Sequence, residues 1–420
     1  MKINIETYGC ESNVSSSETI AGLIAEAGHQ MVPFDSAEVI ILNTCALQLS
    51  TENKILRRLS ELNMQRKRVL VMGCLTEIIK EKIEEVAPTA SIAAVSSTAH
   101  VVEILEKMQS NTRVLRFKDK PIQLINSPKL KINQYVAIIP ISDGCSENCS
   151  YCIDAITRGI LISNEPDRII REVQNAVASG AREIHLVAQD VAAYGKDNGS
   201  RLPALLRKLT SIPGEFRIKL GSMNPTNVMP ILKDLILAYN HPKIYKYLEI
   251  PMQSGSNKIL AEMKREYTAE QYKNIVAEFR KAYSNTTIAT DVIIGFPGES
   301  DEDFGKTIAL INEIKPDVLK AYNYSVRPLT KAASMPDQIP SWKIKNRSDE
   351  VKTLSMKYAD MKNEEWLGWK GDVLVTEMDD GTPIGRNFAY KPVLLDNRAK
   401  VGDVVTAEIT KTRSDYLVAK

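Results

Sequence analysis

The sequence predicts an α/β protein in three parts: a doubly wound α/β domain, a partial (βα)6 barrel and a small, OB-like C-terminal β-barrel. Three observations support this prediction. Strand and helix patterns alternate between residues 2 and 109, and they alternate again between residues 135 and 326. After residue 369 only short strand patterns remain. We place the domains at 1–110, 134–340 and 363–420, with a linker at 111–133 and a connecting helix at 341–362.

The first part alternates four strands with four helices. Apolar alternation or short apolar runs predict the strands, at 2–8, 39–43, 68–73 and 91–95. Apolar residues at helical spacing predict the helices, at 16–28, 53–65, 78–87 and 100–109. Gly28 ends the first helix and Pro88 stops the third. Residues 110–133 are polar, basic and broken by prolines, which is typical of a linker or an exposed hairpin.

The middle part repeats the βα unit six times, about three-quarters of an eight-stranded barrel. Its strands are predicted at 135–142, 183–189, 216–222, 245–252, 287–297 and 318–326. Its helices are predicted at 167–180, 202–210, 229–239, 256–265, 269–284 and 301–315. One long helix over 341–368 then leads to C-terminal strands at 371–378, 384–395, 403–411 and 414–420.

Composition is that of a soluble globular protein, with 44% hydrophobic and 25% charged residues. The net charge of +2 neither requires nor excludes a nucleic-acid partner. The sequence contains neither a signal-peptide pattern nor an apolar run long enough for a membrane span. We therefore expect a cytoplasmic protein without a membrane partner, whose reducing surroundings disfavour disulfides.

Three cysteines in the first domain each follow a predicted strand: Cys10, Cys45 and Cys74. Parallel strands end at the same edge of their sheet, so these cysteines are expected to converge there. The alternative is three unrelated buried cysteines.

Three further cysteines, Cys145, Cys149 and Cys152, lie in the first βα loop of the barrel. Four thiolates complete a cubane iron–sulfur cluster, so three leave one iron open for a ligand. The alternative is a zinc site that borrows a distant histidine. The available histidines, His29, His100, His185 and His241, show no ligand-like spacing. The aromatic Tyr151 directly before the last cysteine also favours the iron–sulfur site.

The spacing C-x3-C-x-aromatic-C resembles the motif of the radical S-adenosylmethionine superfamily. Together with "TYGCESN", "ILNTC", "VMGC", "PMQSGSNKIL…MKREYT" and "DVIIGFPGE", it resembles the methylthiotransferase family across the whole chain. That family has an N-terminal domain with a second cluster, a radical SAM core and a C-terminal TRAM domain that binds RNA. The resemblance implies two [4Fe–4S] clusters and S-adenosyl-L-methionine as cofactors.

The resemblance also implies roles for all six cysteines. Cys145, Cys149 and Cys152 would hold the catalytic, radical-generating cluster. Cys10, Cys45 and Cys74 would hold the cluster that carries the incoming sulfur. One S-adenosylmethionine would methylate that sulfur, and a second would supply the radical. Residues expected to line this cofactor are Tyr151, Gln189, Gln253, Ile294 and Gly295.

Several of these residues have a structural alternative. Gln253 belongs to "QSGS", whose Ser256 is able to cap the next helix instead. Gln189 and Asp190 face the same choice at the end of their strand, and Gly295 also fits a plain strand-to-helix turn. Arg158, close after the cysteines, is either a surface charge or a contact to cofactor or RNA.

The charge of the C-terminal domain does not predict RNA binding; only its β-rich pattern and its resemblance to TRAM do. Arg386, Phe388, Tyr390 and Lys391 are the expected contact patch. The alternative is that Phe388 and Tyr390 fill the small barrel.

The segments "AQDVAAYGKD" and "GRNFAYKPVLL" resemble the branch that acts on N6-threonylcarbamoyladenosine beside the tRNA anticodon. The expected partners are tRNA, approaching the lateral opening of the barrel, and an electron donor such as ferredoxin or flavodoxin; the sulfur donor is unknown. Alternatives within the family are isopentenyladenosine in tRNA and a ribosomal-protein aspartate. The alternative outside it is an RNA-binding protein with structural clusters. Leu329 departs from the family pattern, which often has glycine there.

Overall fold

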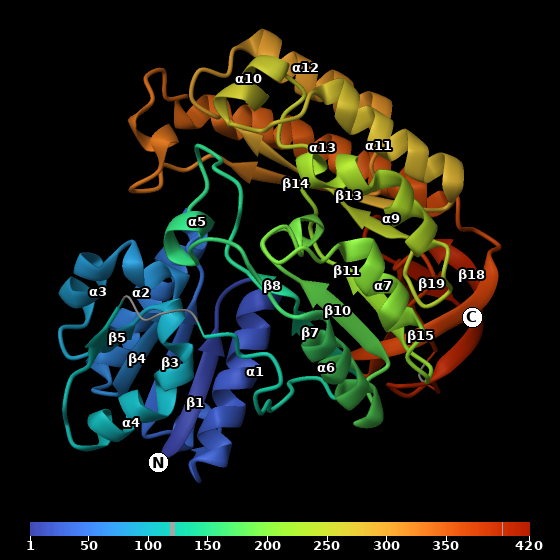
Figure 1. Ribbon diagram of the computed structural model, residues 1–420. Helices are drawn as coiled ribbons and strands as arrows, with labels where there is room; N and C mark the ends of the chain where they lie inside the picture. Colours follow the sequence, from blue (N-terminus) through green and yellow to red (C-terminus); the bar gives the residue numbers. More distant parts are fainter. Residues whose placement is uncertain (118–121, 397) are drawn as a thin grey trace.

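The computed structural model describes residues 1–117, 122–396 and 398–420 (Figure 1). The N-terminal domain contains a six-stranded sheet in the order β2-β1-β3-β4-β5-β6, with every neighbouring pair parallel. The four predicted strands are confirmed as β1 (Lys2–Thr7), β3 (Val39–Thr44), β4 (Arg68–Gly73) and β5 (Ser91–Ala93).

Two short edge strands, β2 (Gln30–Met31) and β6 (Leu115–Arg116), were not predicted because two residues carry no readable alternation. The strand β6 lies in the segment predicted as a linker, but it pairs with β5 in the N-terminal sheet. Residues 118–121 of that predicted linker lie outside the described residues.

Helices cover both faces of the N-terminal sheet because the apolar side chains of β3 alternate between them. Ile40 and Leu42 pack with α2 (Leu49–Met64) and α3 (Lys80–Val86). Val39 and Ile41 pack with α1 (Glu11–Glu26) and α4 (Val101–Gln109) on the opposite face. This arrangement is the doubly wound architecture that the sequence predicted.

The first helix begins at Glu11, directly after Cys10, and not at Ser16 as predicted. Its first turns are polar but buried, so the apolar periodicity could not reveal them. Ser15 Oγ donates to the Ile138 carbonyl of the barrel at 3.1 Å, and Ser17 Oγ accepts from Asn43 Nδ2 at 2.8 Å.

Six parallel strands form the partial barrel, in the series β7-β10-β11 and β12-β13-β14. A parallel bridge between Ile218 and Ile244 connects the two halves. The strands are β7 (Val136–Pro140), β10 (Glu183–Val187), β11 (Arg217–Leu220), β12 (Tyr247–Glu249), β13 (Thr287–Ile294) and β14 (Val318–Asn323). The six predicted βα units are confirmed, and the barrel is open between β7 and β14.

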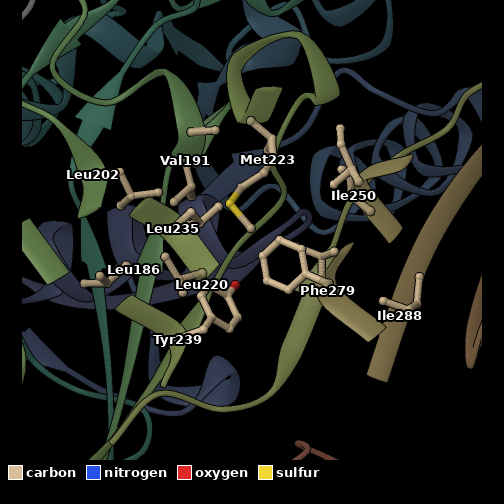
Figure 2. Close-up of a cluster of buried hydrophobic side chains, with 14 of the residues drawn as sticks. Leu186, Val191, Leu202, Leu220, Met223, Leu235, Tyr239, Ile250, Phe279 and Ile288 are labelled. Atoms are coloured by element: carbon tan, nitrogen blue, oxygen red, sulfur yellow. The ribbon is translucent and has the colours of Figure 1, made fainter. Parts of the chain in front are cut away.

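The outward faces of these strands pack against a ring of helices. The helices are α6 (Pro166–Ala178), α7 (Leu202–Thr210), α9 (Leu232–Tyr239), α11 (Ala269–Ala282) and α12 (Asp301–Ile314). Figure 2 shows Leu186 and Leu220 from the strands beside Tyr239 and Phe279 from the helices. The two aromatic rings meet edge to face at 5.1 Å. Each such fully buried side chain contributes about 2 kcal/mol or more, so this layer holds the barrel rigidly.

A helix of 24 residues, α13 (Ser341–Glu364), leads from the large barrel to a closed five-stranded one. The strand order is β15-β16-β17-β19-β18, which confirms the predicted C-terminal β-barrel. Their bounds are β15 (Lys370–Asp379), β16 (Thr382–Arg386), β17 (Pro392–Leu394), β18 (Val404–Thr412) and β19 (Leu417–Ala419).

The single strand predicted at 384–395 is wrong, because a turn at 387–391 divides it into β16 and β17. The buried Asn387 side chain accepts hydrogen bonds from the backbone N–H groups of Ala389 and Lys391, each at 3.0 Å. Tyr390 takes a left-handed backbone conformation with φ of 62°. An asparagine side chain that replaces backbone partners in this way ends a strand.

The N-terminal domain is attached to both strands that border the open side of the barrel. Helix α1 packs against β7, while Arg327, after β14, forms a buried ion pair with Glu52 of α2. The lateral opening, where the sequence led us to expect RNA, is therefore bordered on both sides by this domain (Figure 1). None of the described helices combines the length and apolar character needed to cross a lipid bilayer.

Candidate functional site

The three N-terminal cysteines lie at one edge of the first sheet. Cys10, Cys45 and Cys74 follow β1, β3 and β4, which are neighbouring parallel strands. Cys45 and Cys74 are buried and Cys10 is exposed. Burial, with smaller effects from Cys74 and Cys10, raises the pKa of the Cys45 thiol to about 12. The strand order brings the three cysteines to the same edge of the sheet.

Tight packing of the strand ends keeps this edge compact. Gly73 has φ of 105°, and a Cβ added there would lie 2.4 Å from the Thr44 carbonyl oxygen. Asn13 Nδ2 donates to the same carbonyl at 3.1 Å, and its Oδ1 lies 3.5 Å from Cys10 Sγ. The sequence around each cysteine thus sets the spacing of the three sulfurs.

The second cysteine set lies in the segment 143–159, which we call the cysteine loop. It begins beyond β7, at the last residue of the short strand β8 (Ser142–Asp143). Gly144 has φ of 71°, and a Cβ there would meet the Ile160 carbonyl oxygen at 2.0 Å. The Cys145 N–H donates to the Gly159 carbonyl at 3.1 Å, which closes the base of the loop.

The far side of the cysteine loop is held by two later segments of the barrel. The Ser150 N–H donates to the Met263 carbonyl at 3.1 Å, and Ser150 Oγ donates to the Glu262 carbonyl at 2.7 Å. The Ser150 carbonyl accepts from the Ala332 N–H at 2.8 Å. These bonds fix the loop against the carboxyl ends of the barrel strands.

Each sulfur of this loop accepts a hydrogen bond. The Glu147 N–H donates to Cys145 Sγ at 3.4 Å, and the Asp154 N–H donates to Cys152 Sγ at 3.5 Å. Cys149 Sγ accepts from Arg265 Nη1 at 3.4 Å. Such donors stabilise thiolate sulfur, the form that binds metal.

Arg265 was not predicted as a site residue. Its guanidinium lies 5.3 Å from the centre of the Tyr267 ring, and its Nε has no partner among the described residues. The only signal in the sequence was its position in "MKREYT", one of the segments that carried the family resemblance.

The two cysteine sets meet across the end of the cysteine loop. The short helix α5 (Asp154–Thr157) packs against the turn that starts at Cys74. Arg158 follows it and bonds Asp143 Oδ1 at 3.0 Å. Burial raises the pKa of the Cys74 thiol, and the nearby Arg158 charge opposes that rise. The sequence left Arg158 undecided between surface and site, and the structure places it between the two sets.

The donor set fits iron–sulfur clusters. All six cysteines are free thiols. Among the described residues, no three Cys, His, Asp or Glu side chains are gathered tightly enough to chelate a single ion. A cubane differs because each cysteine binds a separate iron, so the thiols stand further apart.

The residues expected to line S-adenosylmethionine lie at the carboxyl ends of the strands, with different side-chain directions. Gln253 has a left-handed φ of 59°, and its carbonyl accepts from Ile293 N–H at 3.0 Å. The Ile294 side chain is buried in the outer core, so only its backbone borders the barrel mouth. Gly295 N–H donates to Glu299 at 3.0 Å, and Tyr151 meets Phe296 edge to face at 6.4 Å.

Gln189 lines a cavity of about 270 Å³ between the N-terminal domain and the barrel. Its Oε1 is buried without a hydrogen-bond partner among the described residues. The Asp190 carboxylate, in contrast, accepts three hydrogen bonds from within the protein. The donors are the backbone N–H groups of Ala192 and Asn224 and the side-chain Nδ2 of Asn227. The structure therefore gives Asp190 a structural role and leaves the Gln189 oxygen available.

The interior of the barrel is polar, which the sequence analysis missed. Glu11, next to Cys10, reaches in from α1 and contacts His185 Nδ1 at 2.9 Å and Lys219 Nζ at 2.8 Å. His185 Nε2 lies 2.5 Å from Glu183, which also accepts from Tyr245 OH at 2.7 Å. Burial favours the protonated acid, but His185 and Lys219 outweigh it and lower the pKa of Glu11 to about 2.

The four residues expected to contact RNA do not form an exposed patch. Lys391 is 3% exposed and bonds Asp317 at 2.8 Å. Tyr390 packs its ring on Tyr245 at 4.9 Å, at the amino-terminal end of the large barrel.

Arg386 bonds Glu377 at 2.7 Å and lies 5.1 Å from the Tyr390 ring. Phe388, at 37%, is partly exposed beside Trp366 and Trp369. One exposed patch of these four residues does not fit their positions, because Tyr390 and Lys391 join the two barrels.

Family models match two parts of the chain. "Radical SAM superfamily" matches residues 139–311, which include the cysteine loop and most of the barrel. "Uncharacterized protein family UPF0004" matches residues 2–94, which include the N-terminal cysteine set.

Similar proteins align with the full chain. Probable threonylcarbamoyladenosine tRNA methylthiotransferases are 37% identical in Pyrococcus abyssi and 39% identical in Archaeoglobus fulgidus, covering 100% of this chain and 99% and 98% of theirs. The human threonylcarbamoyladenosine tRNA methylthiotransferase is 32% identical over 99% of this chain and 73% of its own. The radical S-adenosylmethionine methyltransferase TsrM from Kitasatospora setae shares the fold, with a TM-score of 0.58, 12% identity and 79% and 75% coverage.

Proposed function

Because the chain belongs to the radical SAM methylthiotransferase family, we propose that it adds a methylthio group to C2 of N6-threonylcarbamoyladenosine beside the tRNA anticodon. The observation that best supports this proposal is the pair of three-cysteine sets, which meet where α5 of the cysteine loop packs against the turn at Cys74. A single set would fit many radical enzymes, whereas a second set at the edge of another sheet fits the insertion of sulfur.

The cofactors of the family are S-adenosyl-L-methionine and two [4Fe–4S] clusters. We assign one cluster to Cys145, Cys149 and Cys152 and the other to Cys10, Cys45 and Cys74. When bound, these groups would supply the carbon-centred radical and a carrier for the incoming sulfur, with two S-adenosylmethionine molecules used per turnover.

The chain itself positions these groups and excludes water. Arg265 and the two backbone N–H donors stabilise the sulfurs of the cysteine loop. Tyr151 and Phe296 form an apolar wall beside that loop. Gln189 Oε1, Gln253 and the backbone at Ile294 and Gly295 are the proposed contacts of S-adenosylmethionine.

A polar barrel interior favours a polar N6 substituent over an apolar one. Threonylcarbamoyl carries a hydroxyl, a urea and a carboxylate, which are able to exchange hydrogen bonds with charged or hydroxylated side chains. The Glu11, His185, Lys219 and Tyr245 network provides such groups. These side chains bond one another, and a threonylcarbamoyl group is able to exchange hydrogen bonds with them, whereas an isopentenyl group is not. This favours the present substrate, although a 34% identical relative is a dimethylallyladenosine synthase.

We further propose that the enzyme works in the cytoplasm, where its thiols stay reduced, and that ferredoxin or flavodoxin supplies electrons. The sulfur donor is left unassigned. The domain division at 1–110, 134–340 and 363–420 is retained as a proposal, with β6 added to the first domain because of its pairing with β5.

The test is mass spectrometry of tRNA nucleosides from cells with and without the gene. We expect 2-methylthio-N6-threonylcarbamoyladenosine to disappear in the deletion and to return with the wild-type gene, but not with a Cys149→Ala gene. Loss of the isopentenyl derivative instead would identify the alternative substrate. Unchanged nucleosides, with no S-adenosylmethionine cleavage by the reconstituted protein, would point to a non-enzymatic RNA-binding role.

A further inference from the structure

Two exposed lysines, Lys264 and Lys331, lie together beside the cysteine loop. Lys264 ends the turn after α10 (Asn257–Glu262) with a left-handed φ of 56°. Lys331 begins the short helix η6 (Lys331–Ser334). Both side chains are exposed, and the charge of Lys331 acts on Lys264. We call them the lysine pair.

The backbone holds the lysine pair against the cysteine loop. Ser150 bonds the carbonyl of Met263, directly before Lys264, and the N–H of Ala332, directly after Lys331. Both lysines therefore flank Ser150, which lies between two of the proposed cluster ligands. The backbone of both lysines is therefore held beside the cysteine loop, at the mouth of the barrel.

Neither lysine has a carboxylate partner within ion-pairing distance in the described part of the chain. The nearest acids in sequence, Glu262 and Glu266, are exposed and bond neither lysine. The nearby Lys331 lowers the pKa of Lys264. Two like charges held together without a counter-ion are suited to an anion with two accepting oxygens.

Exposed apolar groups lie on the same segment as Lys331. Leu329 is 72% exposed with a left-handed φ of 69°, and Val326 is 53% exposed. Apolar side chains beside cations suit a nucleotide, whose phosphate is charged and whose base has an apolar face.

From this juxtaposition we propose that the lysine pair binds a backbone phosphate of the substrate RNA, next to the modified nucleotide. The inference rests on the proposed function, because it takes tRNA as the substrate. Phosphate contacts fix the register of a nucleic acid, so the pair would set which base reaches the cysteine loop. An acidic electron-donor protein is the competing occupant. The exposed Glu262 and Glu266 would repel such a surface, whereas one phosphate is able to reach the lysines without meeting them.

The test compares K264Q/K331Q with wild type in the reconstituted full-length protein. The control variant K233Q/K352Q removes the same charge from exposed lysines elsewhere, and K264R/K331R keeps the charge in place. Binding is measured on tRNA that carries N6-threonylcarbamoyladenosine, at several salt concentrations. Iron content and the rate of S-adenosylmethionine cleavage without RNA show whether each variant is folded and loaded.

We expect K264Q/K331Q to bind tRNA roughly tenfold more weakly, with normal iron content and cleavage. The slope of log affinity against log salt is expected to fall by about 1 for one shared phosphate, or about 2 for two phosphates. K264R/K331R and K233Q/K352Q are expected to bind nearly as wild type does.

The phosphate site is wrong if K264Q/K331Q and K233Q/K352Q show the same affinity and salt slope. If tRNA binding is unchanged but reduction of the cluster by flavodoxin slows, the lysine pair is a protein-docking site and the proposal is overturned. If wild-type protein itself neither binds nor modifies this tRNA, the proposed function fails, and the phosphate site fails with it. These results are distinguishable because each changes a different measurement.

Discussion

Arg265 is the only charged side chain in the described structure seen to donate a hydrogen bond to a cysteine of the loop. A cation and a hydrogen bond beside a cluster stabilise its reduced, more negative state. R265M is therefore expected to lower the reduction potential of that cluster by an amount on the order of tens of millivolts. An EPR-monitored redox titration measures this shift. R265K should recover part of the potential, and R201M, at an exposed arginine, should leave it unchanged; an equal potential in R265M would contradict the role.

At the same scale, the tight packing around Gly73 leads us to predict that a substitution there removes one of the two clusters. In G73A the new Cβ would meet the Thr44 carbonyl at 2.4 Å, in a conformation that side chains rarely adopt. The edge that carries Cys45 and Cys74 must then open, so we expect the cluster content to fall from about two per chain to about one. Iron and labile-sulfide analysis measures the change. The control is G28A, where φ is 80° but nothing lies within 4 Å; equal iron loss in both would show that strain alone is responsible.

The cysteines were predictable from the sequence, but Arg265 and Glu11 were not. A cysteine at a strand end, or three within one loop, is visible because position in the chain already determines position in the fold. Arg265 reaches Cys149 from a segment more than a hundred residues away, and Glu11 reaches His185 across two domains. Such contacts depend on how domains pack, which local patterns do not record.

At the scale of the element, strands that show a local apolar pattern were predicted correctly. Elements that depend on side-chain hydrogen bonds were not. The barrel strands were predicted because one of their faces is apolar along its length. The break between β16 and β17 was missed because Asn387 stops the strand through side-chain hydrogen bonds while the apolar pattern continues. The start of α1 was missed because its first turns bury serine and asparagine.

Helix α12 depends on a capping box, in which Ser300 and Asp303 bond each other's backbone N–H groups. Burial favours the protonated Asp303, but bonds from Ser300, Ser256 and Lys258 prevail and lower the pKa of its carboxyl. A lowered pKa in the folded state gives stability above the ordinary value near 4, and that stability is lost as pH falls below it.

We therefore expect D303N to be about 1–2 kcal/mol less stable than wild type at pH 7. The difference should narrow when pH is lowered toward 3. Urea unfolding at several pH values measures it, with E302Q, at an exposed neighbour, as the control. A difference that stays constant with pH would show that the carboxylate charge is not what stabilises the helix.

At the scale of the whole molecule, the position of the N-terminal domain decides whether the two clusters can act together. The buried pair of Arg327 and Glu52 ties this domain to the end of the large barrel. E52Q leaves the Arg327 charge buried without its partner, which costs about 3–5 kcal/mol. We expect methylthio transfer to fall at least tenfold in E52Q, while S-adenosylmethionine cleavage, which needs only the radical cluster, is retained.

Product analysis by mass spectrometry gives both rates from one reaction. E81Q, on the exposed surface of α3, is the matched control and should behave as wild type does. Parallel loss of both activities in E52Q would mean that the ion pair supports the fold in general and not the alignment of the two domains.

The position of Tyr390 determines what removal of the C-terminal barrel would test. Its ring, carried by the small C-terminal barrel, lies against Tyr245, Tyr247 and His185. It therefore covers the amino-terminal end of the large barrel. Deleting the C-terminal barrel would expose this end of the large barrel and let water and dioxygen reach the buried polar network inside it. A truncated enzyme would then lose activity even on a substrate that needs no RNA-binding domain. Point variants on the outer surface of the small barrel leave the Tyr390 ring in place. They therefore test the contribution of this barrel to RNA binding without opening the large barrel.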